Sequence, residues 1–335
     1  MIGVYVHNRG RGHLNRVLPV VAALRDSGEE VTMLLAGPFD ERTRPRGSSV
    51  VHLPATRSEV GPDPDDIDLS ARRAAVTWID RMRPRTVWVD GPPAMSLAAR
   101  MTGTPVVSTL PPGLRDDEPH VLRCRAAETL LAAWPPGVHP ATVAGTRGRV
   151  REVGGISRFE RRDREQHPRR RRPRVVHLNS AGPSGDHRFW RAVRSTAQRL
   201  GVAEWVEVGG PDGVWREDPW DELTSADVVV TCAGQASVAD AACSNVPMVV
   251  VPRRHEYGEQ DATAGALGAF DGTAVLRYGD GPTAVAHAVC DQVARSLDQA
   301  SGGIRDRWGV DGAASRAAEV IRSTTTTTTR TAVTH

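Results

Sequence analysis

The sequence predicts an α/β protein of two domains, each built on a parallel β-sheet with helices on both faces. Its 335 residues suffice for two domains, and 39% of them are hydrophobic, enough for each domain to have its own core. Short runs of Val, Ile and Leu alternate with longer segments of helical periodicity. Because these runs lack polar alternation, both faces of each strand are expected to be buried, as in parallel sheets.

The strand candidates form two series, one for each sheet. The first is Ile2–Val6, Val31–Ala36, Val50–Leu53, Val87–Val89, Val106–Ser108 and Val150–Val153. The second is Val175–Leu178, Trp205–Val208, Val228–Thr231, Met248–Val251 and Ala274–Leu276. After the first strand, apolar residues from Leu14 to Leu24 recur at helical spacing, and Gly28 follows where that helix should end.

Composition along the chain divides it into segments. Residues 1–157 are expected to form the N-terminal domain, and residues 175–310 the C-terminal domain. Between them, residues 158–174 read RFERRDREQHPRRRRPR, with almost nothing apolar to bury, which predicts an exposed basic linker. Residues 311–322 are predicted to form a final helix, and the threonine-rich residues 323–335 a disordered tail.

Charge and cysteine content exclude several functions. The 43 basic residues, all of them arginine, nearly balance the 40 acidic ones, so bulk attraction to nucleic acid is not expected. The four cysteines form no CxxC pair, which argues against a zinc site and a disulfide framework. No secretion signal or membrane-length apolar run is present. We expect a cytoplasmic protein, with attachment to the inner face of the membrane left open.

The loop after the first strand is the first candidate site, because ligands bind at the carboxyl ends of strands in open parallel sheets. In HNRGRGHLNR, Gly10 and Gly12 permit a tight turn that exposes backbone amides at the next helix start. His13 lies at this mouth, where an imidazole can take a proton from a hydroxyl; a structural histidine is the alternative. Asn15 and Arg16 are candidate substrate contacts. A third glycine is missing, so the dinucleotide fingerprint is absent.

The second series of strands carries the second group of candidate binding residues. The loop NSAGPSGD can be interpreted either as a phosphate-binding loop or as an ordinary turn between a strand and a helix. Its candidates are Ser180, Gly182, Ser184 and Gly185. Further on, Gly234 and Gln235 open a helix that can receive a diphosphate, and Asp240, two turns later, can accept hydrogen bonds from ribose hydroxyls. A polar cluster that follows can bind a hexose: His255, Glu256, Glu259 and Gln260.

These segments together resemble the nucleotide-sugar glycosyltransferases of the GT-B fold, which have two facing Rossmann-like domains and an interdomain cleft. The resemblance is to members related to the peptidoglycan N-acetylglucosaminyltransferase and the diacylglycerol glycosyltransferases. It extends from GRGHLNR to the helix after Gln260 and is strongest in ADVVVTCAGQASVADAACSNVPMVVVP.

The resemblance implies roles for individual residues. It places Gly234 at the donor diphosphate and Asp240 at the ribose. HEYGEQDATA resembles the sugar-contacting segment, which implies that Glu259 and Gln260 contact the donor hexose, and Arg158, after VGGIS, matches an arginine near the donor phosphates. Glu259 replaces the glutamine of the peptidoglycan enzyme, so N-acetylglucosamine is not implied as the sugar.

The predicted reaction is transfer of a hexose from a nucleoside diphosphate sugar to an acceptor hydroxyl, with His13 as general base. Inversion at the anomeric carbon is implied by the resemblance, and neither a cofactor nor a metal is expected. Asp63 and Asp65 mimic a metal-binding motif but suit a solvated turn in their proline-rich loop.

Two alternatives to this reaction stay open. One is a nucleotide-sugar epimerase or hydrolase that uses Glu256 and Glu259, and the other is a noncatalytic nucleotide-sugar-binding protein. The acceptor is lipid-linked, part of the cell envelope, or a natural product. Residues 116–134 suit a lipid-facing helix, and packing on the sheet explains the same apolar residues, among them Leu130, Leu131 and Trp134.

Overall fold

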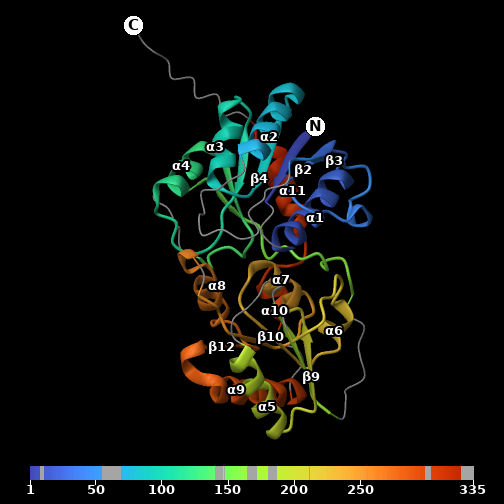
Figure 1. The fold of residues 1–335 in the computed structure, drawn as a ribbon, viewed down its shortest axis with the longest axis vertical. Coiled ribbons are helices and arrows are strands. Elements are labelled where there is room, and N and C mark those ends of the chain that lie inside the picture. Colours follow the sequence, from blue (N-terminus) through green and yellow to red (C-terminus); the bar gives the residue numbers. More distant parts are fainter. Residues whose placement is uncertain are drawn as a thin grey trace.

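The N-terminal domain is built on a seven-stranded sheet of order β3-β2-β1-β4-β5-β6-β7 in which every neighbouring pair is parallel (Figure 1). Its strands are β1 Ile2–Val6, β2 Val31–Leu35, β3 Ser49–His52, β4 Thr86–Asp90, β5 Val106–Thr109, β6 Thr129–Ala132 and β7 Val150–Glu152. The structure is a computed structural model that describes residues 1–7, 11–54, 69–139, 146, 148–163, 172–179, 187–210, 212–254, 256–298 and 303–325.

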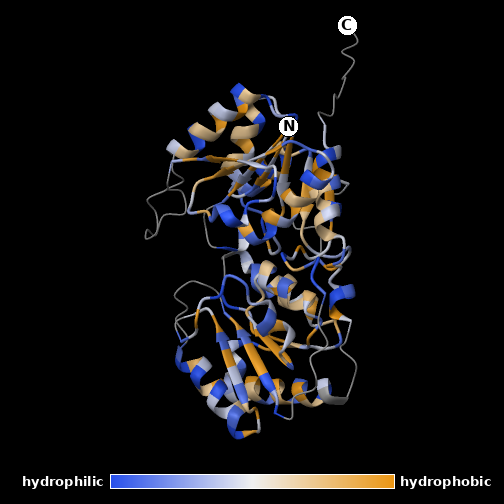
Figure 2. Ribbon diagram, turned by 90° about the vertical axis from the view of Figure 1, so that its right-hand side faces the viewer, coloured by the Kyte–Doolittle hydropathy of each residue, from blue (hydrophilic) through white to orange (hydrophobic). Residues whose placement is uncertain are grey.

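The C-terminal domain has a five-stranded parallel sheet of order β12-β11-β10-β8-β9. Its strands are β8 Arg174–Leu178, β9 Glu204–Val208, β10 Val228–Thr231, β11 Met248–Val250 and β12 Thr273–Val275. Figure 2 shows hydrophobic residues along the strands of both sheets. The expectation of parallel sheets buried on both faces is therefore confirmed.

Helices cover both faces of each sheet. On the N-terminal sheet, α1 Arg11–Asp26 and α11 Ala313–Ser323 lie on one face; α2 Leu69–Met82, α3 Pro93–Met101 and α4 Glu118–Ala126 lie on the other. On the C-terminal sheet, α5 His187–Arg199 and α9 Gly281–Asp298 lie on one face; α6 Trp220–Thr224, α7 Gln235–Cys243 and α8 Glu259–Leu267 lie on the other. Short elements are α10 Ile304–Arg307, η1 Glu41–Thr43, η2 Glu256–Gly258 and η3 Tyr278–Asp280.

The final helix, predicted from the sequence, crosses back to the N-terminal domain. Ala317 and Ile321 of α11 are buried against Val17 and Leu24 of α1 and the strands beneath them. Figure 1 shows α11 inside the N-terminal domain beside α1, although the preceding helix, α10, lies in the C-terminal domain. The chain thus crosses between the domains twice.

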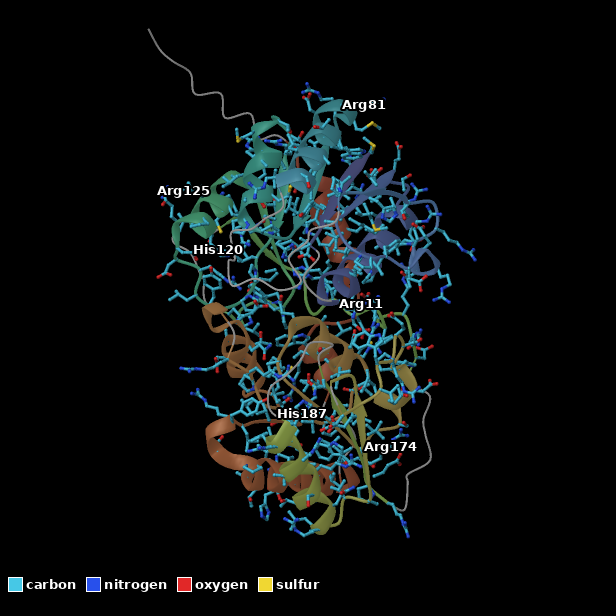
Figure 3. All side chains as sticks on the ribbon, in the orientation of Figure 1. Arg11, Arg81, His120, Arg125, Arg174 and His187 are labelled. Carbon is cyan, nitrogen blue, oxygen red and sulfur yellow. The ribbon has the colours of Figure 1, made fainter. Side chains whose placement is uncertain are left out.

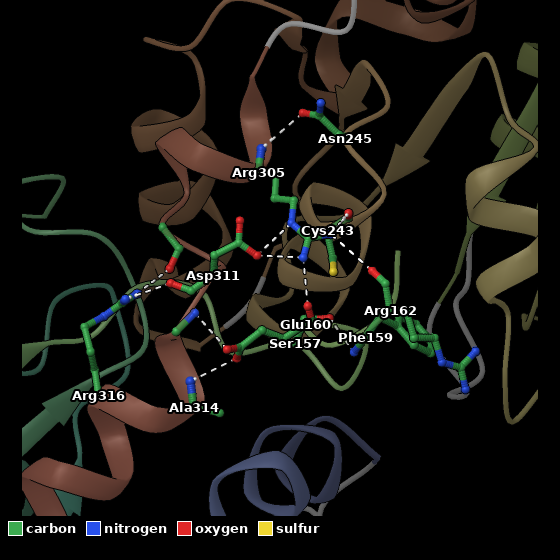
Figure 4. Close-up of polar contacts among 12 residues, drawn as sticks. Ser157, Phe159, Glu160, Arg162, Cys243, Asn245, Arg305, Asp311, Ala314 and Arg316 are labelled. Atoms are coloured by element: carbon green, nitrogen blue, oxygen red, sulfur yellow. Dashed lines mark hydrogen bonds and ion pairs between the residues drawn. The ribbon is translucent and has the colours of Figure 1, made fainter. Parts of the chain in front are cut away.

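Arg305 joins the two crossing segments (Figure 4). Its guanidinium donates a hydrogen bond to the carbonyl oxygen of Glu160, on the first crossing, at 2.7 Å and pairs with Asp311, on the second, at 2.6 Å. The Glu160 carboxylate in turn accepts a hydrogen bond from the backbone N–H of Ala314, in the first turn of α11, at 3.1 Å. A carboxylate stabilises the unpaired amides of a helix start, so both crossings are held together at this point.

Of the two interpretations left open for residues 116–134, the lipid-facing helix is wrong. Residues 116–134 do not form a lipid-facing helix, because α4 ends at Ala126 and residues 129–132 form β6. Leu130 and Leu131 are fully buried and face opposite sides of the sheet, each in a separate core, as adjacent strand residues must. Packing on the sheet therefore accounts for these residues.

The predicted basic linker is not solvated where it begins. Phe159 is 2% exposed, and its ring packs against Trp220 with 5.1 Å between ring centroids. The guanidinium groups of Arg158 and Arg162 lie over the same ring. This single aromatic residue anchors the start of the linker, and residues 164–171 lie outside the described part of the chain. No helix among the described residues is long and apolar enough to span a membrane.

Candidate active site

The strand order of each sheet reverses at one point, and such switch points are where open parallel sheets bind ligands. In the N-terminal sheet the reversal lies between β1 and β4, and in the C-terminal sheet between β8 and β10. The first switch point carries His7 and Asp90 at its strand ends, and α1 begins there. The second carries Asn179 and the turn before Gly234.

His13 lies at the N-terminal switch point beside Asp90, the last residue of β4. Its Nδ1 is 3.4 Å from Oδ1 of Asp90, which is almost fully buried, whereas the imidazole itself is partly exposed. The ring of His7 meets the ring of His13 edge-on at 5.3 Å. Because Nδ1 faces the carboxylate, Nε2 is the nitrogen available to a substrate. The geometry suits a general base with an orienting carboxylate.

Arg16, one turn further along α1, holds Asp90 with two parallel hydrogen bonds. Nε donates to Oδ2 at 3.1 Å and Nη2 donates to Oδ1 at 2.8 Å. The same Nη2 is 3.3 Å from Nδ1 of His13, and Nε2 can act as a base in the tautomer whose Nδ1 proton is directed at Asp90. Burial would raise the pKa of Asp90, but the charges of Arg16 and His13 outweigh burial and hold that pKa well below 3.8. Asp90 is therefore a carboxylate throughout the neutral range.

The predicted phosphate-binding helix start faces this cluster across the domain boundary. Gly234 is the N-cap residue of α7, and the preceding Ala233 has a φ of 63°. Oε1 of Gln235 accepts a hydrogen bond of 3.1 Å from Nη1 of Arg16. A Cβ added to Gly12 would lie 3.9 Å from the Cβ of Ala236, so α1 and α7 approach closely. The start of α7, whose first amides have no partner within the helix, therefore lies next to the first turns of α1, which carry His13.

Asp240 and Arg158, which the resemblance places at the ribose and the phosphates, contact each other. Nε of Arg158 donates to Oδ2 of Asp240 at 3.0 Å, and the hydroxyl of Ser157 donates to Oδ1 at 2.8 Å. Asp240 is only 3% exposed, and burial raises its pKa although Arg158 opposes the effect. In this structure the pair ties the start of the linker to α7. Its contact with a donor stays a prediction.

The predicted sugar-binding residues Glu259 and Gln260 lie at the start of α8. Oε2 of Glu259 is 2.8 Å from Nη2 of Arg115, in the segment after β5 of the other domain. Oε1 of Gln260 accepts a hydrogen bond from the backbone N–H of Arg253 at 2.9 Å. Glu259 also acts electrostatically on Arg16. The starts of α7 and α8 therefore both contact the N-terminal domain, through Gln235 and Glu259 respectively.

Several predicted site residues cannot be placed. Outside the described residues lie Gly10, Ser180, Gly182, Ser184, Gly185, His255, Asp63 and Asp65, and the side chain of Glu256 is also not described. Asn15 lies half-buried on α1, beside Arg16 in the sequence. In the described part of the chain, no group of three His, Cys, Asp or Glu side chains is arranged to hold a metal ion. The four cysteines are unpaired, with Cys290 the most exposed.

Sequence reasoning missed three residues in this region. Asp90 ends a buried strand and precedes a glycine, a pattern that marks a candidate ligand position. Arg115 has no such signal among 43 arginines. Trp215 follows β9 and is 41% exposed. Its ring lies beside Gly209, 3.5 Å from where a Cβ on that glycine would be. Figure 3 shows Arg11, whose guanidinium lies over Trp215, and His120 at the edge of the N-terminal domain that faces the other domain.

Comparison with known proteins agrees with this geometry. Residues 220–303 match the family model described as the glycosyltransferase family 28 C-terminal domain. No curated protein matches the sequence. Among solved structures, the chain is similar to the glycosyltransferase of kitacinnamycin, with a TM-score of 0.68, 18% identity, and 96% of this chain and 98% of that chain covered. It is also similar to MurG from Acinetobacter baumannii, with a TM-score of 0.66, 18% identity, and coverage of 96% and 99%.

A third similar structure is LpCGTa in complex with UDP, with a TM-score of 0.67, 14% identity, and coverage of 96% and 98%. These likenesses extend over nearly the whole chain and confirm the predicted GT-B fold with two facing domains. The family model covers the predicted donor-binding stretch, including Gly234, Asp240 and Glu259. Both findings support the prediction of a glycosyltransferase.

Proposed function

We propose that the protein transfers a hexose from a nucleoside diphosphate sugar to an acceptor hydroxyl, with inversion at the anomeric carbon. The observation that carries this proposal is the position of His13, which lies beside the buried Asp90 and one turn before Arg16, the residue that contacts Gln235 at the start of α7. The glycosyltransferase family 28 match over α7 and α8 supports the assignment of the C-terminal side to the donor.

In the proposed reaction, Nε2 of His13 takes the proton of the acceptor hydroxyl while the acceptor oxygen attacks the anomeric carbon. The bond from that carbon to the diphosphate oxygen breaks, and its electron pair stays on the diphosphate. Asp90 keeps the imidazole oriented and stabilises the imidazolium that forms. The amides at the start of α7, together with Arg16, stabilise the charge on the leaving diphosphate, so a metal ion is not required.

The nucleoside base has a candidate position at the end of β9. The exposed ring of Trp215 lies beside Gly209, which directly follows β9 next to the switch point of the C-terminal sheet. Aromatic side chains bind bases by stacking, with little preference among bases. Stacking does not select among bases, so the first donors to examine are chosen from the similar LpCGTa, which was solved with UDP; we propose UDP sugars first, with dTDP sugars beside them.

The test is binding and transfer by the purified full chain with UDP-glucose, UDP-N-acetylglucosamine and dTDP-glucose. The acceptor panel covers lipid-linked, cell-envelope and natural-product hydroxyls. We expect His13→Ala to lower kcat by about a hundredfold or more, while the donor Kd stays within about twofold. His52→Ala, an exposed histidine on β3, is the matched control and should retain the wild-type rate. Failure to bind any nucleotide sugar would refute the proposal.

The two alternatives make different predictions. An epimerase or hydrolase that uses Glu259 would turn over the donor without an acceptor, but that carboxylate is already paired with Arg115. A noncatalytic binding protein would bind a donor normally, and His13→Ala would change no product. A cytoplasmic enzyme that contacts the inner membrane surface would sediment with anionic vesicles, and one without such contact would not.

A further inference from the structure

The segment after β5 of the N-terminal domain fits closely against the start of α8 in the C-terminal domain. The backbone N–H of Leu114 donates to the carbonyl oxygen of Tyr257 at 3.0 Å. Gly113 has a φ of +89°, and a Cβ there would overlap that oxygen and lie 3.0 Å from the backbone nitrogen of Glu259. Only glycine permits this approach, so the backbone itself brings Arg115 to Glu259.

Arg115 is held rigidly where it meets Glu259. It is 6% exposed, and its guanidinium lies over the ring of Tyr257 at 4.2 Å from the centroid. Its Nη1 is 3.3 Å from Nε2 of His120, whose Nδ1 is in turn 2.7 Å from a carboxylate oxygen of Asp117. With Nδ1 protonated toward Asp117, Nε2 accepts the hydrogen bond from Arg115. Three contacts therefore orient the guanidinium before any ligand binds.

The contact leaves Glu259 able to bind a ligand. Oε2 is bound to Arg115 at 2.8 Å, and among the described residues Oε1 accepts no hydrogen bond. The side chain is 25% exposed, so a ligand can reach it. A carboxylate accepts hydrogen bonds only, so the group that Oε1 binds must be a donor such as a sugar hydroxyl. The neighbouring guanidinium offsets the charge of Glu259, so the pair has no net charge to attract a ligand ammonium group over a neutral hydroxyl.

We infer that Arg115 is a positioning residue for the donor sugar, by which the N-terminal domain orients Glu259 of the C-terminal domain toward a hydroxyl of a neutral hexose. This inference rests on the proposed function, because it requires the sugar to lie at the start of α8. It means that the N-terminal domain, which carries the proposed acceptor side, takes part in selecting the donor sugar. It also favours a neutral hexose over a cationic amino sugar.

The test compares UDP with UDP-glucose, and dTDP with dTDP-glucose, by calorimetry on the full chain. The ratio of the two Kd values measures what the hexose adds to binding. In Arg115→Gln we expect the Kd of UDP to be unchanged and that of UDP-glucose to rise about tenfold, since a charge-assisted contact is lost. Arg115→Lys should restore part of the loss. Arg149→Gln, an arginine anchored on the carbonyls of Cys124 and Ala127 beside α4, is the matched control.

The outcomes separate the inference from the proposed function. Wild-type protein that binds no nucleotide refutes the proposed function itself. If it binds nucleotides but the hexose adds nothing, or if Arg115→Gln leaves UDP-glucose binding unchanged, the inference is wrong and the proposed function stands. If Arg115→Gln weakens the binding of UDP and of UDP-glucose equally, Arg115 only holds the two domains together, and the inference is overturned. UDP-glucosamine binding as tightly as UDP-glucose overturns the preference for a neutral sugar. Should Arg115→Gln not fold, Arg115→Lys and Glu259→Gln provide the same comparison.

Discussion

Arg16 and Gln235 are joined by a hydrogen bond of 3.1 Å from Nη1 to Oε1, although they lie 219 residues apart in different domains. The same guanidinium holds both oxygens of Asp90. One buried cation thus connects the carboxylate beside the proposed base to the helix start proposed for the diphosphate.

Asp90→Asn is expected to lower kcat by about a hundredfold while the donor Kd changes by less than about twofold. The amide cannot balance the imidazolium charge of His13, and it presents an N–H to Arg16. Steady-state kinetics and calorimetry with the best donor measure both quantities. Asp80→Asn, an exposed residue of α2, is the control. Wild-type kcat in Asp90→Asn would show that the carboxylate does not support the base.

The two buried carboxylates are expected to have opposite effects on the pH dependence of stability. The pKa of Asp90 is lowered in the fold, so its stabilisation is present above its ordinary pKa of 3.8 and is lost as the pH falls below that value. The pKa of Asp240 is raised, so its stabilisation is greatest at or below 3.8 and is lost as the pH rises through the raised pKa.

Urea unfolding of the wild type, Asp90→Asn and Asp240→Asn between about pH 3 and pH 7 measures these two contributions. The stability difference between the wild type and Asp90→Asn should shrink toward acid pH. The difference between the wild type and Asp240→Asn should move in the opposite direction. Slopes of the same sign would contradict the electrostatic account of one of the two sites.

Gly113→Ala is expected to cost about 2–4 kcal/mol of stability, because the new methyl group overlaps the carbonyl of Tyr257 at a positive φ. Gly103→Ala is a matched control, since its φ is +80° but nothing lies within 4 Å. That variant should lose only the backbone strain, about 1 kcal/mol. Chemical denaturation measures both. Equal losses would show that the two domains do not need the close approach at Gly113.

Arg305→Gln is expected to lower the free energy of unfolding by about 1–2 kcal/mol, because the part-buried carbonyl oxygens of Glu160 and Cys243 and the exposed carboxylate of Asp311 lose their donor. Arg307→Gln, two residues away, removes only an exposed ion pair with Asp271 and should change stability by less than about 0.5 kcal/mol. The Kd of UDP should be the same in both variants. Similar stabilities of the two variants would contradict the role assigned to Arg305.

Trp215→Ala should raise the Kd of UDP and that of UDP-glucose by the same factor, about tenfold, because a stacking ring contacts the base and not the sugar. This pattern differs from that expected of Arg115→Gln, which affects the sugar alone. Val214→Ala, the exposed neighbour, is the control. Unchanged UDP binding in Trp215→Ala, measured by calorimetry, would place the base elsewhere.

Much of the fold was predictable because its signals are local. Apolar runs marked every strand except β6, which is four residues long and follows α4 so closely that Leu130 and Leu131 suited a helix face equally well. Glycines marked the starts of α1 and α7, where short-range backbone geometry requires them. Composition did not reveal how the linker begins, because an average over a basic segment does not show that one aromatic residue, Phe159, is buried.

The sequence by itself determined that the protein has parallel sheets and enough strands for two domains. It also identified His13, Gly234 and Glu259 as candidate site residues, because each of these signals depends on a few neighbouring residues. Only the tertiary structure decided their partners. Asp90 meets Arg16 across 74 residues, and Arg115 meets Glu259 across 144. Local sequence does not specify which of many arginines approaches which carboxylate, since that depends on strand order and on how the domains pack. Those pairings determine the electrostatics of the cleft.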